Sequence, residues 1–299
     1  MFALNAHLTR QTRLWCGNVF CHGLERPGAT RKMSTQRFSC AELLGWIVSC
    51  CCWLLLASPT VAQQWEVHET LGHVELFSEF RLLPNVVAAQ LASVEEELSR
   101  NLNLVQPDNA GIQVIVFKSA ASYRAYLSSR IPEARHRRAI FYRSGDQYQI
   151  YAYRHEQLLT DLRHEYTHAI LHRALPFVPL WIDEGLAEYL EVQPERRARS
   201  SRLMAMKWKC RAGWKPSLRN LESIPSAARM TGDHYRDSWA WTHYLLNESD
   251  QTRTLFREYL AAVSAGAAPG AFSEWVALRD SEVEKRVGSY FRRFRISLR

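Results

Sequence analysis

Cysteine is almost absent from the larger part of this sequence. Six of the seven cysteines lie before residue 53, and Cys210 is the only one that follows. A single thiol cannot form an internal disulfide, so the segment after residue 62 is not a disulfide-stabilised scaffold. Because Trp208 and Trp214 flank Cys210, we expect it to be a packed thiol and not a nucleophile.

Long apolar runs are also scarce. One uncharged run, Leu43–Ala57, follows a short basic segment that begins at Met33, and small residues then lead to Ala62. This order is typical of a secretory signal peptide cleaved after Ala62, and the run is short for a membrane-spanning helix. We therefore expect a signal peptide at residues 33–62 and export to the periplasm or the extracellular medium. The alternative is a membrane anchor at residues 43–57.

Residues 1–32 are polar and basic without periodicity, and we expect them to be disordered or to lie upstream of the true start. The whole chain has a formal net charge of +8, but residues 63–299 carry only about +4. That excess is too small to argue for a nucleic-acid partner. We expect a monomer that associates transiently with the envelope. Two groups of arginines are expected in solvated loops: Arg135, Arg137 and Arg138, and Arg196, Arg197, Arg199 and Arg202.

The stretch with the most specific chemistry is His164-Glu165-Tyr166-Thr167-His168, in a run that predicts a helix over Leu158–Leu175. Two histidines four residues apart lie on one face of a helix, so both imidazoles can reach one metal ion. Glu165 lies beside that ion, where it can take a proton from metal-bound water. A structural zinc site is closed by four ligands, often cysteines, and no cysteine lies nearby.

A third ligand is expected shortly downstream, because a catalytic zinc ion usually takes three ligands from the protein. Two prolines end the first helix, and Leu180–Glu191 then predicts a second one. If this second helix folds back antiparallel, it presents Glu184 to the metal beside His164 and His168.

Neighbours of the predicted ligands have expected roles of their own. Gly185 has no side chain to crowd the site. Glu188 lies one turn after Glu184 and could accept the outer N–H of a ligand histidine. His172 continues the spacing of the two histidines, but its direction drifts by about 80° from His164, so we expect it to cover a flank of the helix.

These segments resemble a known family. HEYTH followed by WIDEGLAEYLE is similar to the gluzincin zinc metallopeptidases, the thermolysin and aminopeptidase-N branch of the peptidase MA clan, and above all to bacterial peptidase-MA-like members of unassigned substrate. The close match covers about Asp161–Glu191. The resemblance implies a zincin-like fold, Zn²⁺ bound by His164, His168 and Glu184, and Glu165 as general base. The Gly-x-Met-Glu-Asn-type exopeptidase signature is absent, which argues against aminopeptidase specificity.

The order of elements predicts an α+β fold with a mixed sheet, because strands come first and helices follow. Residues 63–192 should form a sheet lobe with the zinc-site helices, and residues 193–299 a helical lobe. Gln147–Tyr153 is the candidate for the edge strand along the substrate cleft. The expected strands are Trp65–Phe80, Gly111–Phe117, Ala139–Arg143 and Gln147–Tyr153. The expected helices outside the motif are Pro84–Leu104, Ala120–Ser129, His234–Asn247, Thr254–Ala265 and Phe272–Phe291, and Glu195–Pro225 is expected to be irregular.

The patterns together predict an exported zinc metallohydrolase, and most simply a metallopeptidase (a protease) acting on peptide or protein substrates. Tyr235, in a Tyr-x-x-Ser-Trp context, resembles the tyrosine that these families place opposite the zinc, as an oxyanion donor. An ordinary tyrosine at a helix start is the alternative, and His234 is the alternative donor. Two other functions stay open: a non-catalytic zinc-bearing envelope scaffold that binds peptide or glycan, and hydrolysis of a non-protein amide.

Overall fold

The computed structural model describes residues 65–104, 111–198 and 200–293, which belong to one compact unit. The predicted extension, signal peptide and cleavage after Ala62, and the alternative anchor at residues 43–57, lie outside the described residues. Within the described ranges, no helix combines the length and the apolar character needed to cross a membrane.

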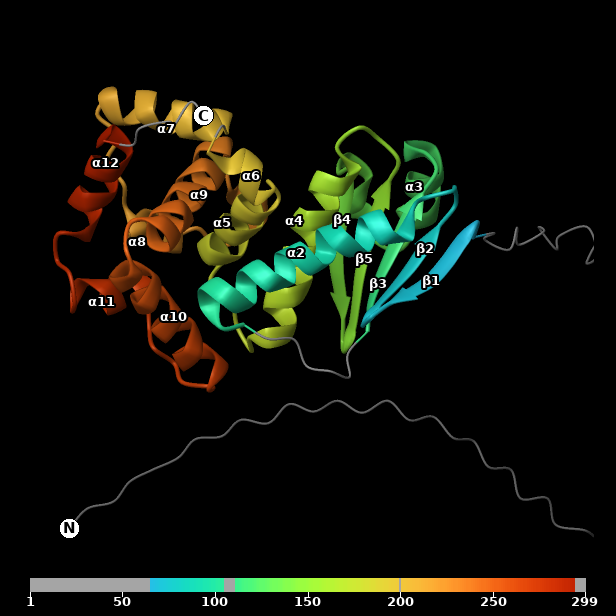
Figure 1. The fold of residues 1–299 in the computed structure, drawn as a ribbon, viewed down its shortest axis with the longest axis horizontal. Helices are drawn as coiled ribbons and strands as arrows, with labels where there is room; N and C mark the ends of the chain where they lie inside the picture. Colours follow the sequence, from blue (N-terminus) through green and yellow to red (C-terminus); the bar gives the residue numbers. More distant parts are fainter. Residues whose placement is uncertain (1–64, 105–110, 199, 294–299) are drawn as a thin grey trace, which may run out of the picture. The chain divides into compact units, whose positions relative to one another are not determined.

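The strands form one five-stranded mixed sheet in the order β1-β2-β3-β5-β4 (Figure 1). The pairs β1–β2 and β4–β5 are antiparallel, whereas β2, β3 and β5 run parallel. With the helices that follow, this sheet confirms the α+β class. The strands are β1 (Val67–Leu71), β2 (Val74–Ser78), β3 (Ile112–Phe117), β4 (Ala139–Ser144) and β5 (Gln147–Tyr153).

Helices make up most of the remaining described chain. Two are short 3-10 helices, η1 (Pro132–His136) and η2 (Ala227–Arg229). The α-helices are α2 (Pro84–Leu102), α3 (Ala120–Leu127), α4 (Leu158–Ala174), α5 (Leu180–Leu190), α6 (Pro194–Arg197), α7 (Ser201–Arg211), α8 (Leu218–Glu222), α9 (Gly232–Asn247), α10 (Asp250–Ser264), α11 (Phe272–Ala277) and α12 (Val283–Arg293).

The sheet is buried on both faces, because alternate residues of β3 enter two separate cores. Ile112, Val114 and Val116 belong to the large core that also contains the apolar faces of α2 and α4. Ile115 and Phe117 belong to a smaller core with α3 and η1. This use of both strand faces follows from the period of two in a strand, and it leaves α4 packed across β4 and β5.

Four predictions of local structure were wrong in part. Trp65–Phe80 is not one strand but the hairpin of β1 and β2, which turns at Gly72 with φ +63°. Glu195–Pro225 is not irregular, because α7 and α8 lie within it. Phe272–Phe291 is divided between α11 and α12. The strand Gln147–Tyr153 is not an edge strand: β5 lies between β3 and β4, so β4 forms that edge of the sheet.

Arg163 fixes the motif helix against its neighbours. Its guanidinium is 1% exposed and donates to the carbonyl oxygen of Leu190 at the end of α5, at 2.8 Å. It also donates to the carbonyl oxygen of Gln90 on α2 at 3.0 Å and pairs with Glu97 at 3.3 Å. A buried cation is tolerated only with such partners, so the residue immediately before the His164–His168 motif sets the position of α4 relative to α2 and α5.

Gly185 allows α5 to approach α9 closely. A Cβ atom at this position would lie 2.4 Å from Oγ1 of Thr242 and 2.7 Å from the carbonyl oxygen of Ser238. The glycine expected to leave room for the metal is therefore required by the facing helix. Because the neighbouring Glu184 is directed toward α4, the α5–α9 contact sets where that carboxylate lies.

We expect Gly185→Ala to destabilise the fold by about 2 kcal/mol or more, since the added methyl group overlaps backbone atoms that cannot move freely. Urea unfolding measures the change. Gly232→Ala is the matched control, because a Cβ there meets nothing within 4 Å, and its stability should stay within about 0.5 kcal/mol of wild type. Equal stability of the two variants would contradict the close contact.

Candidate metal centre

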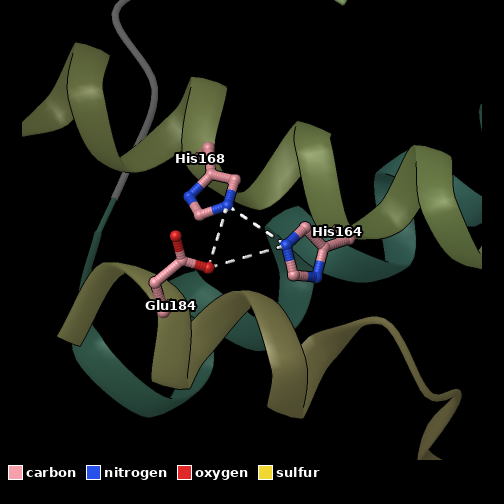
Figure 2. Close-up of side chains that lie close together, drawn as sticks. All are labelled: His164, His168 and Glu184. Atoms are coloured by element: carbon pink, nitrogen blue, oxygen red, sulfur yellow. Dashed lines mark hydrogen bonds and ion pairs between the residues drawn. The ribbon is translucent and has the colours of Figure 1, made fainter. Parts of the chain in front are cut away.

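The three predicted ligands meet at one point between α4 and α5. Figure 2 shows the rings of His164 and His168 and the carboxylate of Glu184 directed toward one another. The two Nε2 atoms are 3.2 Å apart, and Oε2 of Glu184 lies 3.8 Å from Nε2 of His164 and 3.7 Å from Nε2 of His168. The prolines between the helices and the i, i+4 spacing thus produce the predicted convergence.

These distances fit a zinc ion. A point equidistant from the three atoms lies about 2.1 Å from each, which is the usual zinc–nitrogen and zinc–oxygen distance. Two imidazole nitrogens and one carboxylate oxygen are also a known catalytic zinc donor set. The residues present therefore fit the implied metal in both spacing and chemistry.

The outer nitrogens of both rings are held by carboxylates. Nδ1 of His164 lies 2.9 Å from Oε2 of Glu191, and Nδ1 of His168 lies 2.7 Å from Oδ1 of Asp183. Each carboxylate accepts the N–H of Nδ1, so both Nε2 atoms are directed toward the same point. A proton on one Nε2 makes the 3.2 Å contact between them a hydrogen bond, and loss of that proton leaves both lone pairs for a metal ion. Carboxylate–histidine pairs of this kind orient rings that bind metal.

The structure corrects the predicted roles of two neighbours. Glu188 does not hold a ligand histidine; its carboxylate pairs with Arg202, while Glu191 takes His164. His172 does more than cover a flank, because its Nε2 lies 2.9 Å from Oδ2 of Asp183. Asp183 therefore joins His168 and His172 through its two oxygens.

The predicted solvated arginines include three with buried or structural partners. Arg202 reaches the carboxylates of both Glu188 and Glu191, at 2.8 Å for the latter. Arg197 pairs with Glu97, and Arg138 pairs with Asp161 at 3.0 Å. Their contacts tie α7 to α5, α6 to α2, and the start of β4 to α4.

The carboxylates give this cluster a negative electrostatic potential. Burial by itself would lower the pKa of His168, but Asp183 first, and then Glu184 and Glu165, raise the pKa to about 10. Burial likewise opposes protonation of His164, yet its hydrogen bond to Glu191 leaves the pKa raised. Burial raises the pKa of Glu184. Carboxylates packed around imidazoles in this way favour a cation at their centre.

Glu165 is positioned by the edge strand of the sheet. Its side chain is 7% exposed, and Oε2 accepts a hydrogen bond from the backbone N–H of Phe141 on β4 at 2.7 Å. The carboxylate lies close enough to His168 to raise the pKa of that ring. Sequence reasoning found Glu165 but not its partner, because β4 is distant along the chain.

Tyr235 lies in the first turn of α9 and is half-buried. It precedes Ser238 by three residues, so it shares the face of α9 that packs on Gly185. Burial raises the pKa of its phenol, and Glu184 is the next largest cause of the rise. The structure thus brings Tyr235 into the electrostatic range of the cluster.

His234 has a separate structural task. Its Nδ1 accepts a hydrogen bond from the backbone N–H of Thr231 at 3.1 Å, and its own backbone N–H donates to the hydroxyl of Thr231. This reciprocal cap begins α9. The cap uses Nδ1 of His234 and leaves its Nε2 as a donor, whereas the phenol of Tyr235 takes no part in the cap.

No protein-family model and no curated protein sequence matches this chain. The resemblance to the gluzincins therefore depends on the motif residues and on the geometry just described.

We expect Glu191→Gln to weaken zinc binding by about 10–100-fold, because the amide lacks the charge that orients and strengthens His164. Competition with a chromogenic chelator measures the affinity. Glu195→Gln is the control: this residue lies four positions further on, is exposed, and should leave the affinity unchanged. Equal affinities for both variants would remove Glu191 from the site.

Proposed function

We propose that this protein is an exported zinc-dependent metallohydrolase of the gluzincin type, and most specifically a metallopeptidase. The observation that carries the proposal is the convergence of His164, His168 and Glu184 at zinc-binding distances. The carboxylates behind both rings support it further, because they hold the two Nε2 atoms toward each other and toward Glu184. A zincin-like arrangement of the mixed sheet and the motif helix is part of the same proposal.

The chain's own residues divide the work of peptide hydrolysis. Zinc, when bound, supplies positive charge that polarises the scissile carbonyl and acidifies water. Glu165, fixed by Phe141, takes a proton from the attacking water and passes it to the leaving amine as the C–N bond breaks. Tyr235 donates a hydrogen bond to the carbonyl oxygen as negative charge develops on it.

The free edge of β4 is the proposed site for the substrate backbone. Among the described residues β4 pairs with β5 alone, and its Phe141 N–H donates to Glu165. A peptide that extends this edge by main-chain hydrogen bonds would lie beside the general base. The proposal thus gives Ala139–Ser144 the role predicted for Gln147–Tyr153, because β4 and not β5 forms that edge.

Glu165→Gln separates an enzyme from a zinc-bearing scaffold. The substitution removes the base and no ligand, so we expect zinc to stay bound while cleavage of a mixed peptide library falls by about 10²-fold or more. A chelator should abolish the wild-type cleavage. Equal turnover by the two proteins, or none by wild type, would favour the scaffold that binds peptide or glycan.

Tyr235→Phe tests the proposed oxyanion donor. The variant keeps the ring and its packing, and we expect kcat to fall by about 10²–10³-fold with KM little changed. Zinc content and thermal stability should stay near wild type. Wild-type kcat would eliminate Tyr235, and a joint loss of stability and activity would show that it only packs.

A further inference from the structure

The segment Arg196–Leu221 contains nine basic residues and no acidic one. Three of its bases point inward to carboxylates of other elements: Arg197 to Glu97, Arg202 to Glu188 and Glu191, and Lys209 to Asp237. Others have no acidic partner within the part of the chain that the structure describes, among them Lys207, Arg211 and Lys215. The segment therefore carries a positive charge that the fold does not neutralise.

Two of these bases, Lys207 and Arg211, share one side of α7 with two exposed apolar residues. Met204 is 42% exposed and Trp208 is 62% exposed. With Lys207 and Arg211 they follow the i, i+3, i+4, i+7 spacing of one helix side. We call these four residues the outer face of α7. The guanidinium of Arg211 lies 5.1 Å from the ring centroid of Trp208, so cation and aromatic ring form one surface.

Met204 and Trp208 are exposed although the same helix packs other side chains into the core. Leu203, Met206 and Cys210 on the adjoining side of α7 are buried and hold the helix to the fold. Six large apolar residues are exposed among those described, and two of the six lie on this short helix. In Figure 1, α7 lies at the periphery of the helices.

Exposed cations beside exposed apolar side chains match a partner surface that has negative charge outside and an apolar layer beneath it. Tryptophan prefers the interface between lipid and water, and methionine gains by entering the acyl region. Each lysine or arginine near an anionic lipid surface strengthens binding by about five-fold. A polyanion such as a nucleic acid would use the cations, but it would gain nothing from Met204.

We propose that the outer face of α7 docks this protein on an anionic lipid surface. The contact is peripheral and reversible, since one short helix inserts two apolar side chains. The proposal does not depend on the metal centre or on hydrolysis. It names the residues that would make the expected transient contact with the envelope. They differ from Arg197 and Arg202, which pair with carboxylates on α2 and at the end of α5.

Co-sedimentation with lipid vesicles tests the proposal. We expect the wild-type chain to bind vesicles that contain a quarter phosphatidylglycerol more tightly than pure phosphatidylcholine, and less tightly as salt rises. The double variant K207E/R211E should bind the anionic vesicles at least about 25-fold more weakly, from the loss of two attractive charges. M204S/W208S should also weaken binding, with zinc content unchanged.

The control is K118E/R124E, which changes the net charge by the same amount at two exposed positions away from α7. All variants keep the run Leu43–Ala57, so differences between them report on the described surface. Equal binding by the control and by K207E/R211E would overturn the proposal. Unchanged binding by M204S/W208S would also overturn it, because charge alone would then explain the attraction.

Discussion

Burial of charge beside two imidazoles is the constraint on which the rest of this structure depends. Asp183, Glu184, Glu165 and Glu191 approach the rings of His164 and His168 in a region largely closed to water. Buried carboxylates are costly unless they are paired or bind a metal. Each one here has an assigned partner: a ring nitrogen, a backbone N–H, or the point where the three ligand atoms converge.

The same constraint explains why α5 needs particular residues at several positions. One side of this helix presents Glu184 to α4, and the next residue, Gly185, has no side chain because α9 passes too close. The end of the helix presents Glu191 to His164 and its carbonyl at Leu190 to Arg163. A few residues of α5 therefore fix the Glu184 carboxylate, the contact with α9, and the orientation of the His164 ring.

Much of the site could be predicted because its determinants are local. The spacing of His164 and His168 on a helix is set by the helical period, and two prolines define where the next helix begins. Glu184 follows from that break, and the α+β class follows from the order of elements.

Features that depend on tertiary contacts could not be predicted in the same way. Helical spacing predicts Glu188 as the partner of a ligand histidine, and only the crossing of α4 and α5 brings Glu191 to His164 instead. The order of β4 and β5 in the sheet is not encoded in their own patterns, so the edge strand was assigned to the wrong one. Arg163 and Arg202 resemble solvent-exposed arginines until their buried carboxylate and carbonyl partners are known.

Zinc content of the purified chain tests the central claim most directly. The three converging atoms predict about one zinc per chain in wild type and nearly none in Glu184→Ala, because two remaining ligands seldom hold the ion. The variant Glu188→Ala, one turn away, should keep about one zinc per chain, since Glu188 pairs with Arg202. A full equivalent in Glu184→Ala, or loss of zinc in Glu188→Ala, would contradict the assignment of the third ligand.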